Sequence, residues 1–427
     1  MKIKQLHNLF LESKGVSTDT RKVLTGKIFF ALKGDNFNGN TFAKKAIDLE
    51  AKYAIVDEPE FKTSDKTILV DDTLKTLQAL ATFHRGYLNI PIIALTGSNG
   101  KTTTKELINT VISKKYKTTA TKGNLNNHIG VSLTLLSMTN ETEIGIVEMG
   151  ANHLKEIEFL CNIAKPDYGY ITNFGKAHLE GFGGVKGVIK GKSELYYYLT
   201  QNNKHVFLNG DDSIQNEKLS TYAKKSGFSK TNTNYFKIEF IKANPFVSFK
   251  IENTIIKSQL IGKYNFTNLC AASLIGKHFN VNLKDIKIAL EAYLPTNNRS
   301  QIINKNKNKI ILDAYNANPS SMKAALENFS NLKDENKIAF LGDMFELGDE
   351  AKKEHQVILN LSTNLDIDIV YLIGEHFFKT ENNSTKIKIY PSFEALKNNF
   401  NSIKISNATL LIKGSRGMAL ERILDLI

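Results

Sequence analysis

The chain has little of what marks secreted, disulfide-bonded or membrane-spanning proteins. Its two cysteines, Cys161 and Cys270, cannot build a disulfide framework, and both lie in apolar, helix-like segments, so we expect buried free thiols. No apolar run reaches the roughly 18 to 20 residues that a membrane span needs. The first residues, MKIKQLHNLFLESKG, lack a long apolar core followed by a small-residue cleavage site. These absences predict a cytoplasmic protein with no membrane span.

Tryptophan is also absent, and no basic segment is interleaved with aromatic residues, although the net charge is +13. Nucleic-acid binding is one interpretation of such a charge. However, lysine and asparagine are spread along the whole chain, as in NKNKNK at residues 304–309. We therefore expect no nucleic-acid partner, and an anionic small substrate is a better explanation for part of the charge.

The 427 residues suggest two to four domains, and three blocks emerge. Residues 1–88 mix short strands, Gly/Asn turns and short helices. Residues 89–297 open with a strand, a loop and a helix, and residues 298–427 alternate strands and helices up to a final helix. This order predicts an α/β fold with a small α/β N-terminal domain, a central P-loop-type domain with a mostly parallel sheet, and a Rossmann-like C-terminal domain. Ligands in such sheets bind at the carboxyl ends of the strands.

The most informative segment is IIALTGSNGKTTTK, residues 92–105, in which an apolar run meets a glycine-containing loop and a helix-like pattern. The common phosphate loop reads G-x-x-x-x-G-K-[ST], and its first glycine would fall at Leu95. The loop is therefore shorter than usual on its N-terminal side. A plain Gly/Asn turn before an ordinary helix is the alternative interpretation.

The chemistry of this loop nevertheless suits a nucleotide phosphate. Gly97 and Gly100 permit a tight curve and close approach of an anion, and the amides at the start of the following helix would face it. Lys101 would reach the outer phosphates, and Thr102 could bind magnesium. The expected phosphate-binding residues are Thr96, Gly97, Ser98, Asn99, Gly100, Lys101, Thr102 and Thr103.

The spelling TGSNGKTTTK is similar to the shortened phosphate loop of the Mur ligase family, which builds the peptide stem of bacterial cell-wall precursors. Folylpolyglutamate synthetases share this style of loop. Further motifs match the family in order along essentially the whole chain. The resemblance implies an ATP-dependent ligase that forms an amide through an acyl phosphate, with ATP bound between the central and C-terminal domains.

The resemblance also implies a magnesium site. Glu148 ends the apolar segment IGIVE, and a carboxylate there suits a hard cation. His178, in YITNFGKAHLEGFGG, matches the family's second magnesium site. The family pattern A-K-[SG]-E aligns with residues 191–194, which makes Lys192 the lysine that becomes N6-carboxylated. An ordinary strand-end glutamate, a surface histidine and a solvated lysine-rich helix face are the alternatives. The expected ligands of two Mg²⁺ ions are Thr102, Glu148, His178 and carboxylated Lys192, and the expected catalytic residues are Lys101, Lys192, His178 and Glu148.

Other motifs imply nucleotide contacts. GKYNFTN, residues 262–268, matches the family's G-x-H-N-x-x-N, with Tyr264 in the place where histidine is common. Asn265 and Asn268 are expected at the adenine, because a carboxamide offers both a donor and an acceptor. A capped helix start is the alternative there. Arg299 would contact the terminal phosphate. Asp313, at a strand end, would suit the ribose, and Tyr315 and Asn316 complete the expected nucleotide contacts.

Three segments imply contacts with a UDP-linked substrate. STDTR near the N-terminus is similar to the family's uridine-nucleotide site, and KGNLNNHIGV matches the segment that faces the muramoyl group. YNANP, residues 315–319, resembles the form in members that add D-alanyl-D-alanine, although Asn318 before Pro319 is also typical of a helix start. The expected substrate contacts are Thr18, Asp19, Thr20, Arg21, Asn124, Asn126, Asn127, Asn173 and Asn318.

Together these motifs predict a monomeric, ATP-dependent ligase that joins D-alanyl-D-alanine to UDP-N-acetylmuramoyl-tripeptide in peptidoglycan synthesis. Another Mur ligase or a folylpolyglutamate synthetase remains an alternative within the same class. A P-loop NTPase that forms no amide and a basic nucleic-acid-binding protein are alternatives from other classes.

Overall fold

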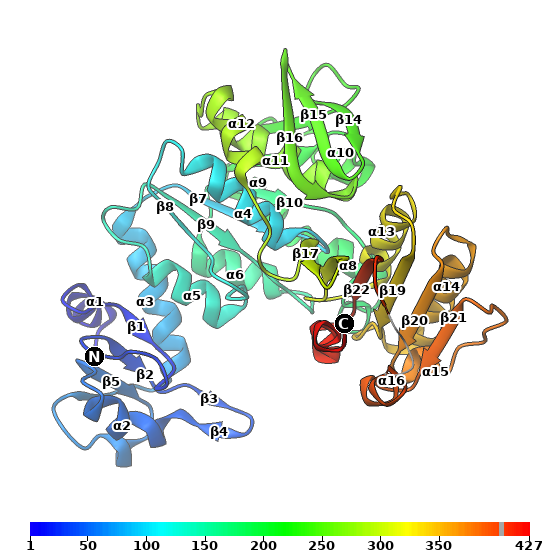
Figure 1. Cartoon of the computed structure of the whole chain (residues 1–427). Coiled ribbons are helices and arrows are strands. Elements are labelled where there is room, and N and C mark those ends of the chain that lie inside the picture. Colours follow the sequence, from blue (N-terminus) through cyan, green and yellow to red (C-terminus); the bar gives the residue numbers. More distant parts are fainter. Residues whose placement is uncertain (401–404) are drawn as a thin grey trace.

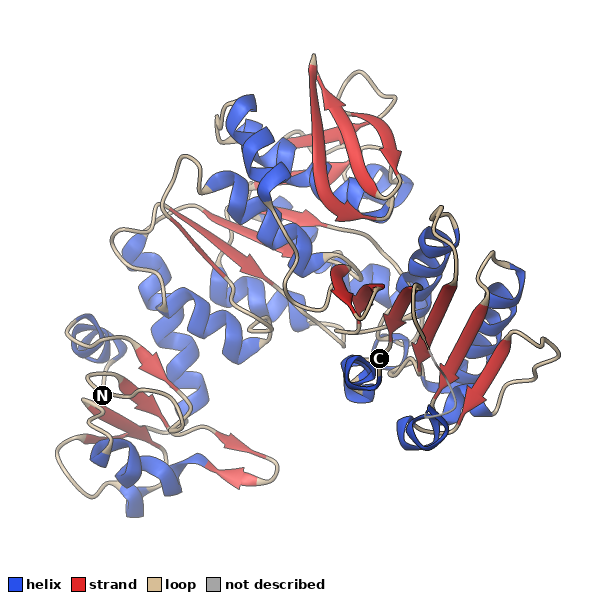
Figure 2. Cartoon of the chain, viewed as in Figure 1, coloured by secondary structure: helices blue, strands red, loops and turns tan. Residues whose placement is uncertain are grey.

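The computed structural model describes residues 1–400 and 405–427, and Figure 1 shows the chain spread over three portions. We call residues 1–88 the N-terminal region, residues 89–297 the central region and residues 298–427 the C-terminal region. These are the domain boundaries expected from the sequence, and they stay a prediction. The separate sheets of the three regions, coloured red in Figure 2, give the molecule its arched outline.

The N-terminal region is built on a four-stranded parallel sheet in the order β1-β2-β5-β6. A separate antiparallel hairpin, β3-β4, projects from it (Figure 1). Helix α3 starts at the Asp72 cap and packs against α5 and α6 of the central region. The elements are α1 (Ile3–Leu11), β1 (Val16–Ser17), β2 (Ile28–Phe30), β3 (Lys33–Gly34), β4 (Phe37–Asn38), η1 (Gly39–Phe42), α2 (Ala43–Asp48), β5 (Tyr53–Val56), η2 (Pro59–Phe61), β6 (Thr67–Leu69) and α3 (Thr73–Leu88).

The central region contains a seven-stranded parallel sheet in the order β13-β12-β11-β10-β7-β9-β8. Strands β7 and β9 are buried along their whole length, which explains why their sequences are nearly continuous apolar runs. The elements that build this sheet are β7 (Ile92–Thr96), α4 (Lys101–Ile112), β8 (Thr118–Ala120), α5 (His128–Leu136), β9 (Ile144–Glu148), α6 (Glu156–Ala164), β10 (Tyr168–Ile171), α7 (Leu179–Phe182), α8 (Val185–Lys192), α9 (Glu194–Gln201), β11 (His205–Asn209), α10 (Ser213–Lys218), β12 (Lys225–Ser229) and β13 (Phe236–Lys237).

The central region also contains a second sheet, which is antiparallel and has the order β14-β15-β16. It is coloured green in Figure 1. Helix α11 then returns and packs against α4, the helix that follows the phosphate loop. The elements are β14 (Glu239–Ala243), β15 (Phe246–Ile251), β16 (Thr254–Ile261), α11 (Tyr264–His278) and α12 (Leu283–Ala292).

The C-terminal region has a six-stranded sheet in the order β17-β18-β22-β19-β20-β21, parallel except for the edge strand β17. Helices cover both of its faces (Figure 2). The elements are β17 (Gln301–Lys305), β18 (Asn308–Asp313), α13 (Pro319–Ser330), β19 (Lys337–Gly342), η3 (Gly348–Glu350), α14 (Ala351–Asn364), β20 (Ile369–Ile373), α15 (Glu375–Phe378), β21 (Ile387–Tyr390), α16 (Phe393–Phe400), β22 (Thr409–Lys413), η4 (Arg416–Met418) and η5 (Leu420–Leu426).

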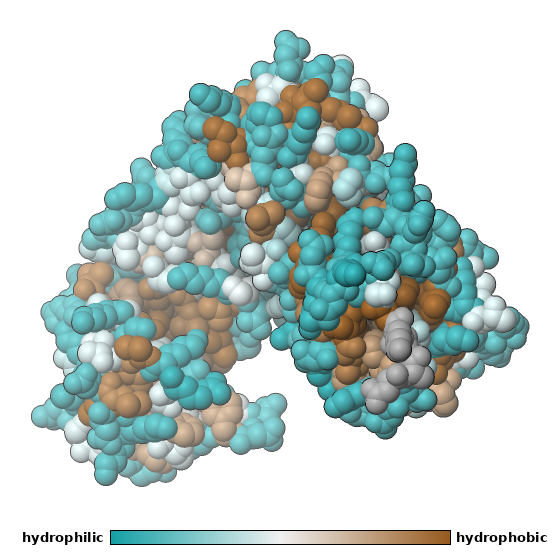
Figure 3. All heavy atoms as spheres, viewed as in Figure 1, coloured by the Kyte–Doolittle hydropathy of each residue, from teal (hydrophilic) through white to brown (hydrophobic). Residues whose placement is uncertain are grey.

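The predicted α/β class, with its central parallel sheet, is confirmed. The expected final helix is wrong in type, because Ala419 takes a left-handed backbone conformation and two 3₁₀ segments follow one another there. Both cysteines are buried free thiols, as expected. On the face drawn in Figure 3, hydrophilic side chains lie over all three regions. Within the described residues, no helix is both long and apolar enough to cross a bilayer.

Candidate active site

A cavity of about 1090 Å³ opens between the carboxyl ends of the central strands and the C-terminal region. Most of the residues expected at the site line it together, although they come from distant parts of the chain. Those that line it are Ser98, Asn99, Gly100, Lys101, Thr102, Thr103, Asn124, Asn126, Asn127, Glu148, Asn173, His178, Asn265, Asn268, Arg299, Asp313, Tyr315, Asn316 and Asn318. Those that do not are Thr18, Asp19, Thr20, Arg21, Thr96, Gly97 and Lys192.

The phosphate loop connects β7 to α4, and two glycines make its path possible. Gly97 has φ +142°, and a Cβ atom there would lie 2.0 Å from the Thr172 hydroxyl. Gly100 has φ +78°, and a Cβ atom there would lie 2.7 Å from Asn268 Oδ1. Larger residues would therefore be both strained and obstructed at these two positions.

Lys101 occupies the inside of this loop. Its Nζ donates to the carbonyl oxygens of Gly97 at 2.7 Å and Ser98 at 3.3 Å. Burial lowers the pKa of Lys101 to about 8, with the charge of Glu148 opposing that shift and the charge of Arg299 adding to it. The amine is thus held where an incoming phosphate would meet it, close to both a carboxylate and a guanidinium.

Glu148 lies at the end of β9 and is 1% exposed. Its Oε1 accepts hydrogen bonds from Thr102 Oγ1 at 3.1 Å and from Asn126 Nδ2 at 2.9 Å. Its Oε2 is buried and has no hydrogen-bond partner among the residues that the structure describes. A buried carboxylate oxygen without a partner is costly in a protein interior, and a hard cation is the partner that suits it best. Among the described residues no three His, Cys, Asp or Glu side chains form a metal-binding cluster, so a cation here would also need hydroxyl or modified-lysine ligands.

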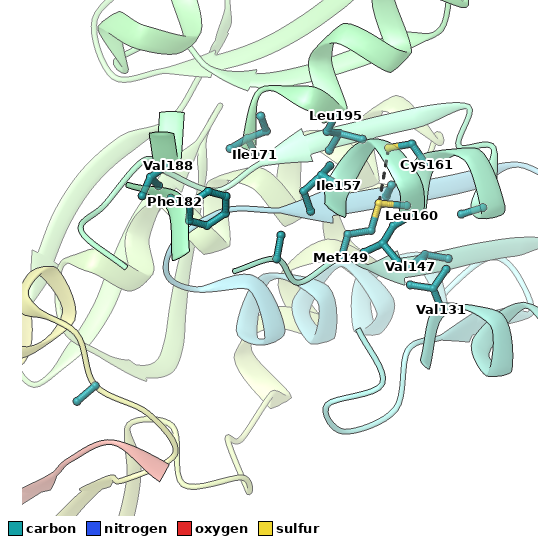
Figure 4. Close-up of a cluster of buried hydrophobic side chains, with 14 of the residues drawn as sticks. Val131, Val147, Met149, Ile157, Leu160, Cys161, Ile171, Phe182, Val188 and Leu195 are labelled. Atoms are coloured by element: carbon teal, nitrogen blue, oxygen red, sulfur yellow. Dashed lines mark hydrogen bonds between the residues drawn. The ribbon is translucent and has the colours of Figure 1, made fainter. Parts of the chain in front are cut away.

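Lys192 ends α8 and is completely buried. Its Nζ donates to Ala151 O at 2.8 Å and lies 5.0 Å from the centre of the Phe182 ring. Burial lowers its pKa well below the usual value, and the charge of Lys101 lowers it further. Figure 4 shows Phe182 among the apolar side chains packed in this part of the core. A solvated helix face is therefore the wrong interpretation for Lys192.

The segment after β10 wraps the other side of the phosphate loop. Asn173 receives a hydrogen bond from Asn99 N at 3.1 Å and returns one to Asn99 O at 3.0 Å. The Thr172 hydroxyl donates to Asn99 O at 2.6 Å. His178, farther along the same segment, forms an ion pair with Glu346 of the C-terminal region. Asn173 therefore shapes the phosphate loop in addition to lining the cavity.

The two asparagines expected at adenine bond to the protein. Asn268 accepts from Thr104 Oγ1 at 3.1 Å and donates to Asn265 Oδ1 at 2.8 Å, and Asn265 donates to Ile261 O at 2.8 Å. The first of these bonds joins α11 to α4. Tyr264, which stands in place of the more usual histidine, pairs its hydroxyl with Ser300 Oγ at 2.7 Å.

The C-terminal region contributes charged side chains to the wall of the cavity. The Arg299 guanidinium lies 3.7 Å from the centre of the Tyr315 ring, and its Nε is buried without a partner. Asp313 accepts from Ser300 N at 3.1 Å and from Lys413 Nζ at 2.6 Å. Lys413 is 2% exposed and lines the cavity, yet the sequence reasoning missed it. The signal was a lysine at the end of the apolar strand TLLIK, which is the position where ligands meet such sheets.

Two asparagines that line the cavity also cap the helices α5 and α13. Asn127 caps α5 by accepting from Ile129 N and Gly130 N. Asn318 caps α13, and its Nδ2 donates to Asn99 Oδ1 of the phosphate loop at 2.7 Å. The helix start expected at Asn318 is thus present, and the same residue also contacts the phosphate loop directly.

The residues expected at the uridine lie in the N-terminal region, away from this cavity. Arg21 Nε donates to Asp19 Oδ1 at 2.9 Å, and that pairing lowers the pKa of Asp19 to about 2. One ligand could contact both these residues and the cavity only if it extended from the N-terminal region to the cavity.

Models of known families match the chain in three successive stretches. Residues 12–85 match "Mur ligase family, catalytic domain", residues 95–276 match "Mur ligase middle domain", and residues 298–416 match "Mur ligase, glutamate ligase domain". The chain belongs to the Mur ligase family, an α/β family whose three matched stretches follow one another here in order.

Individual relatives carry a more particular description. The Bacillus subtilis "UDP-N-acetylmuramoyl-tripeptide--D-alanyl-D-alanine ligase" is 34% identical, with 97% of this chain and 93% of the relative covered. The crystal structure of MurF from Acinetobacter baumannii is 29% identical with a TM-score of 0.87, covering 100% of this chain and 98% of that one. The Thermotoga maritima MurF ligase, solved "in complex with ADP", is 25% identical with a TM-score of 0.85 and the same coverage.

Proposed function

We propose that this protein is an ATP-dependent ligase that joins D-alanyl-D-alanine to UDP-N-acetylmuramoyl-tripeptide in peptidoglycan synthesis. The observation that carries the proposal is the meeting of Lys101, Glu148 and Asn318 at one cavity formed by two regions. A phosphate loop alone would suit any nucleotide enzyme. The full-length similarity to ligases of that name supports this particular reaction.

The proposed reaction has two steps. The terminal carboxylate of the tripeptide attacks the γ-phosphorus of ATP, the bond to ADP breaks, and an acyl phosphate forms. The amine of D-alanyl-D-alanine then attacks the acyl carbon, loses a proton, and expels phosphate. Lys101 and Arg299 offset the charge of the transferring phosphoryl group from two sides, since their charges already act on each other across the cavity.

Residues present at the site fit a divalent cation. The unpartnered Oε2 of Glu148 and the adjacent Thr102 hydroxyl are oxygen ligands of the kind that Mg²⁺ prefers, and His178 and Lys192 complete the proposed set. When bound, Mg²⁺ would neutralise phosphate charge. Lys192 fits N6-carboxylation, because burial lowers its pKa and so favours the neutral, nucleophilic form of the amine that reacts with carbon dioxide.

The remaining assignments complete the proposal. We assign the UDP end of the substrate to Thr18, Asp19, Thr20 and Arg21, the muramoyl segment to Asn124, Asn126, Asn127 and Asn173, and the nucleotide to the phosphate loop with Asn265, Asn268, Arg299, Asp313, Tyr315 and Asn316.

The three regions act as three domains of a cytoplasmic monomer. The gap between the N-terminal and C-terminal regions in Figure 3 supports closure of the domains on the substrate, which would protect the acyl phosphate from water.

A coupled phosphate-release assay tests this function. Purified protein receives ATP, magnesium and a UDP-muramoyl-tripeptide carrying either lysine or diaminopimelate, with and without D-alanyl-D-alanine. We expect sustained phosphate release only when both the tripeptide and the dipeptide are present, and a pentapeptide product by mass spectrometry. Release that is independent of the dipeptide would instead indicate an NTPase that forms no amide.

A further inference from the structure

The segment that carries His178 is held by the C-terminal region at several points. Lys176 Nζ lies 2.5 Å from Oε1 of Glu354, a carboxylate that is 3% exposed. The backbone amide of Lys176 donates to Ser320 Oγ at 2.9 Å, and that of Glu180 donates to Glu346 O at 3.3 Å. These contacts join the loop after β10 of the central region to α13, α14 and the loop before η3.

His178 and Glu346 form the most specific of these contacts. His178 Nδ1 is paired with Glu346 Oε2, and the histidine side chain lowers the pKa of that carboxyl. Both residues have left-handed backbones, with φ +53° at His178 and +62° at Glu346. Such a conformation is unfavourable for a residue with a side chain, so the surrounding contacts must hold both residues in place.

The orientation of the ring follows from this pairing. Since Nδ1 faces Glu346, Nε2 is the ring nitrogen left available, and His178 lines the cavity. A histidine that binds a metal commonly presents its other ring nitrogen to a carboxylate, which fixes the ring and raises the basicity of the ligating nitrogen. Glu346 stands in that relation to His178, although the two residues belong to different regions.

We infer that Glu346 is a positioning residue that orients His178 towards the divalent cation, so that the central region's cation site is complete only when the C-terminal region is docked. The inference rests on the proposed function, because it concerns the cation proposed there. It assigns to the C-terminal region a role in cation binding in addition to its contacts with nucleotide. Glu354 supports the same arrangement by holding Lys176, two residues before His178.

Binding of Mn²⁺ to the full-length protein tests the inference without any turnover. Free Mn²⁺ is counted by its electron paramagnetic resonance signal during titration of wild type, Glu346→Ala, Glu346→Gln and His178→Asn, each with saturating ADP. We expect Glu346→Ala to weaken Mn²⁺ binding by about 10- to 100-fold, the usual range for a residue that supports a metal ligand. Glu346→Gln should weaken it less, because the amide oxygen can still accept from Nδ1–H.

Glu350→Gln is the matched control, since Glu350 lies nearby in η3 and pairs only with the exposed Lys353. Its Mn²⁺ affinity should equal that of wild type. A double variant, His178→Asn with Glu346→Ala, should bind no more weakly than His178→Asn alone. Because Glu346 is half-exposed, the melting temperature of each variant serves to show that it is folded.

The Mn²⁺ titrations distinguish a failure of the proposed role of Glu346 from a failure of the proposed cation site. If wild type binds Mn²⁺ and Glu346→Ala binds it equally well, Glu346 does not position His178 while the proposed ligase remains intact. If wild type itself binds no Mn²⁺ in the presence of ADP, the proposed cation site fails, and the role of Glu346 fails with it. Additive losses in the double variant would also overturn the inference, because they would mean that the two side chains act independently.

Discussion

Asn318 Nδ2 donates a hydrogen bond to Asn99 Oδ1 at 2.7 Å, and this contact joins the first turn of α13 to the phosphate loop. Asn318 Oδ1 meanwhile caps the helix by accepting from Ser321 N at 2.9 Å. One side chain therefore has two separable tasks, a helix cap and a link between regions.

Asn318→Asp separates those tasks. Aspartate keeps the capping oxygen but places an acceptor against Asn99 Oδ1, so the link is lost while α13 is retained. We expect the KM for ATP to rise about tenfold, equivalent to ~1.4 kcal/mol, with an unchanged melting temperature. Steady-state kinetics and thermal unfolding measure the two effects. Asn331→Asp, at the opposite end of α13, adds the same charge away from the phosphate loop and should leave the KM for ATP unchanged.

Lys192→Ala tests the buried lysine. Loss of the amine that we propose to be carboxylated should lower turnover by about 10- to 100-fold or more, as is usual around metal sites. Lys190→Ala is the matched control, because Lys190 lies on the same helix and is exposed. Wild-type enzyme assayed in buffer free of carbon dioxide should also lose activity and regain it with bicarbonate. Near-normal turnover by Lys192→Ala would remove the carboxylated lysine from the proposal.

Lys101 gives ATP binding a pH dependence of predictable sign. Burial lowers its pKa to about 8 without nucleotide, whereas bound phosphates favour the charged amine and raise that pKa. The bound state therefore holds more protons above about pH 8, and affinity should fall there, by up to about tenfold per pH unit. Calorimetry at pH 8.5 in two buffers of different ionisation enthalpy should reveal proton uptake. Lys101→Arg should show none from this site, since arginine stays charged.

Tyr293→Phe tests how the linker to the C-terminal region is held. The Tyr293 hydroxyl contacts Glu106 of α4, and Asn297 Nδ2 donates to the same carboxylate at 2.9 Å. Both residues precede Arg299 closely, so removing the hydroxyl should let Arg299 move away from the phosphate. We expect kcat/KM for ATP to fall about tenfold, equivalent to ~1.4 kcal/mol. Tyr197→Phe, at an exposed tyrosine, should leave kcat/KM unchanged.

The strands around the site could be predicted because burial on both faces leaves unbroken apolar runs, as in β7 and β9. The helix starts at Asn127 and Asn318 were also visible, since asparagine caps are local signals. The antiparallel strands β14 to β16 were not assigned. β14 has no buried residue, β16 alternates between buried and exposed residues over a short length, and no chemical motif marks either strand.

Site residues were predictable where a motif carried them and invisible where only folding brings partners together. Glu148 and Lys101 stand in recognisable strings. Glu346 and Lys413 were not singled out, because their importance comes from His178 and Asp313, which are remote in the chain. For a residue that a motif identifies, the motif does not predict how deeply its side chain is buried. The complete burial of Lys192 could not be predicted from a segment rich in lysine and glycine.

The contacts between the central and C-terminal regions also constrain how this chain can vary over evolutionary time. Asn99 with Asn318, Lys176 with Glu354, and His178 with Glu346 each divide one interaction between two regions. A substitution in one member leaves the other unmatched, so tolerated changes should arrive in pairs. Grafting a C-terminal region from a distant relative onto this central region would therefore require matching these three pairs as well as the linker that joins them.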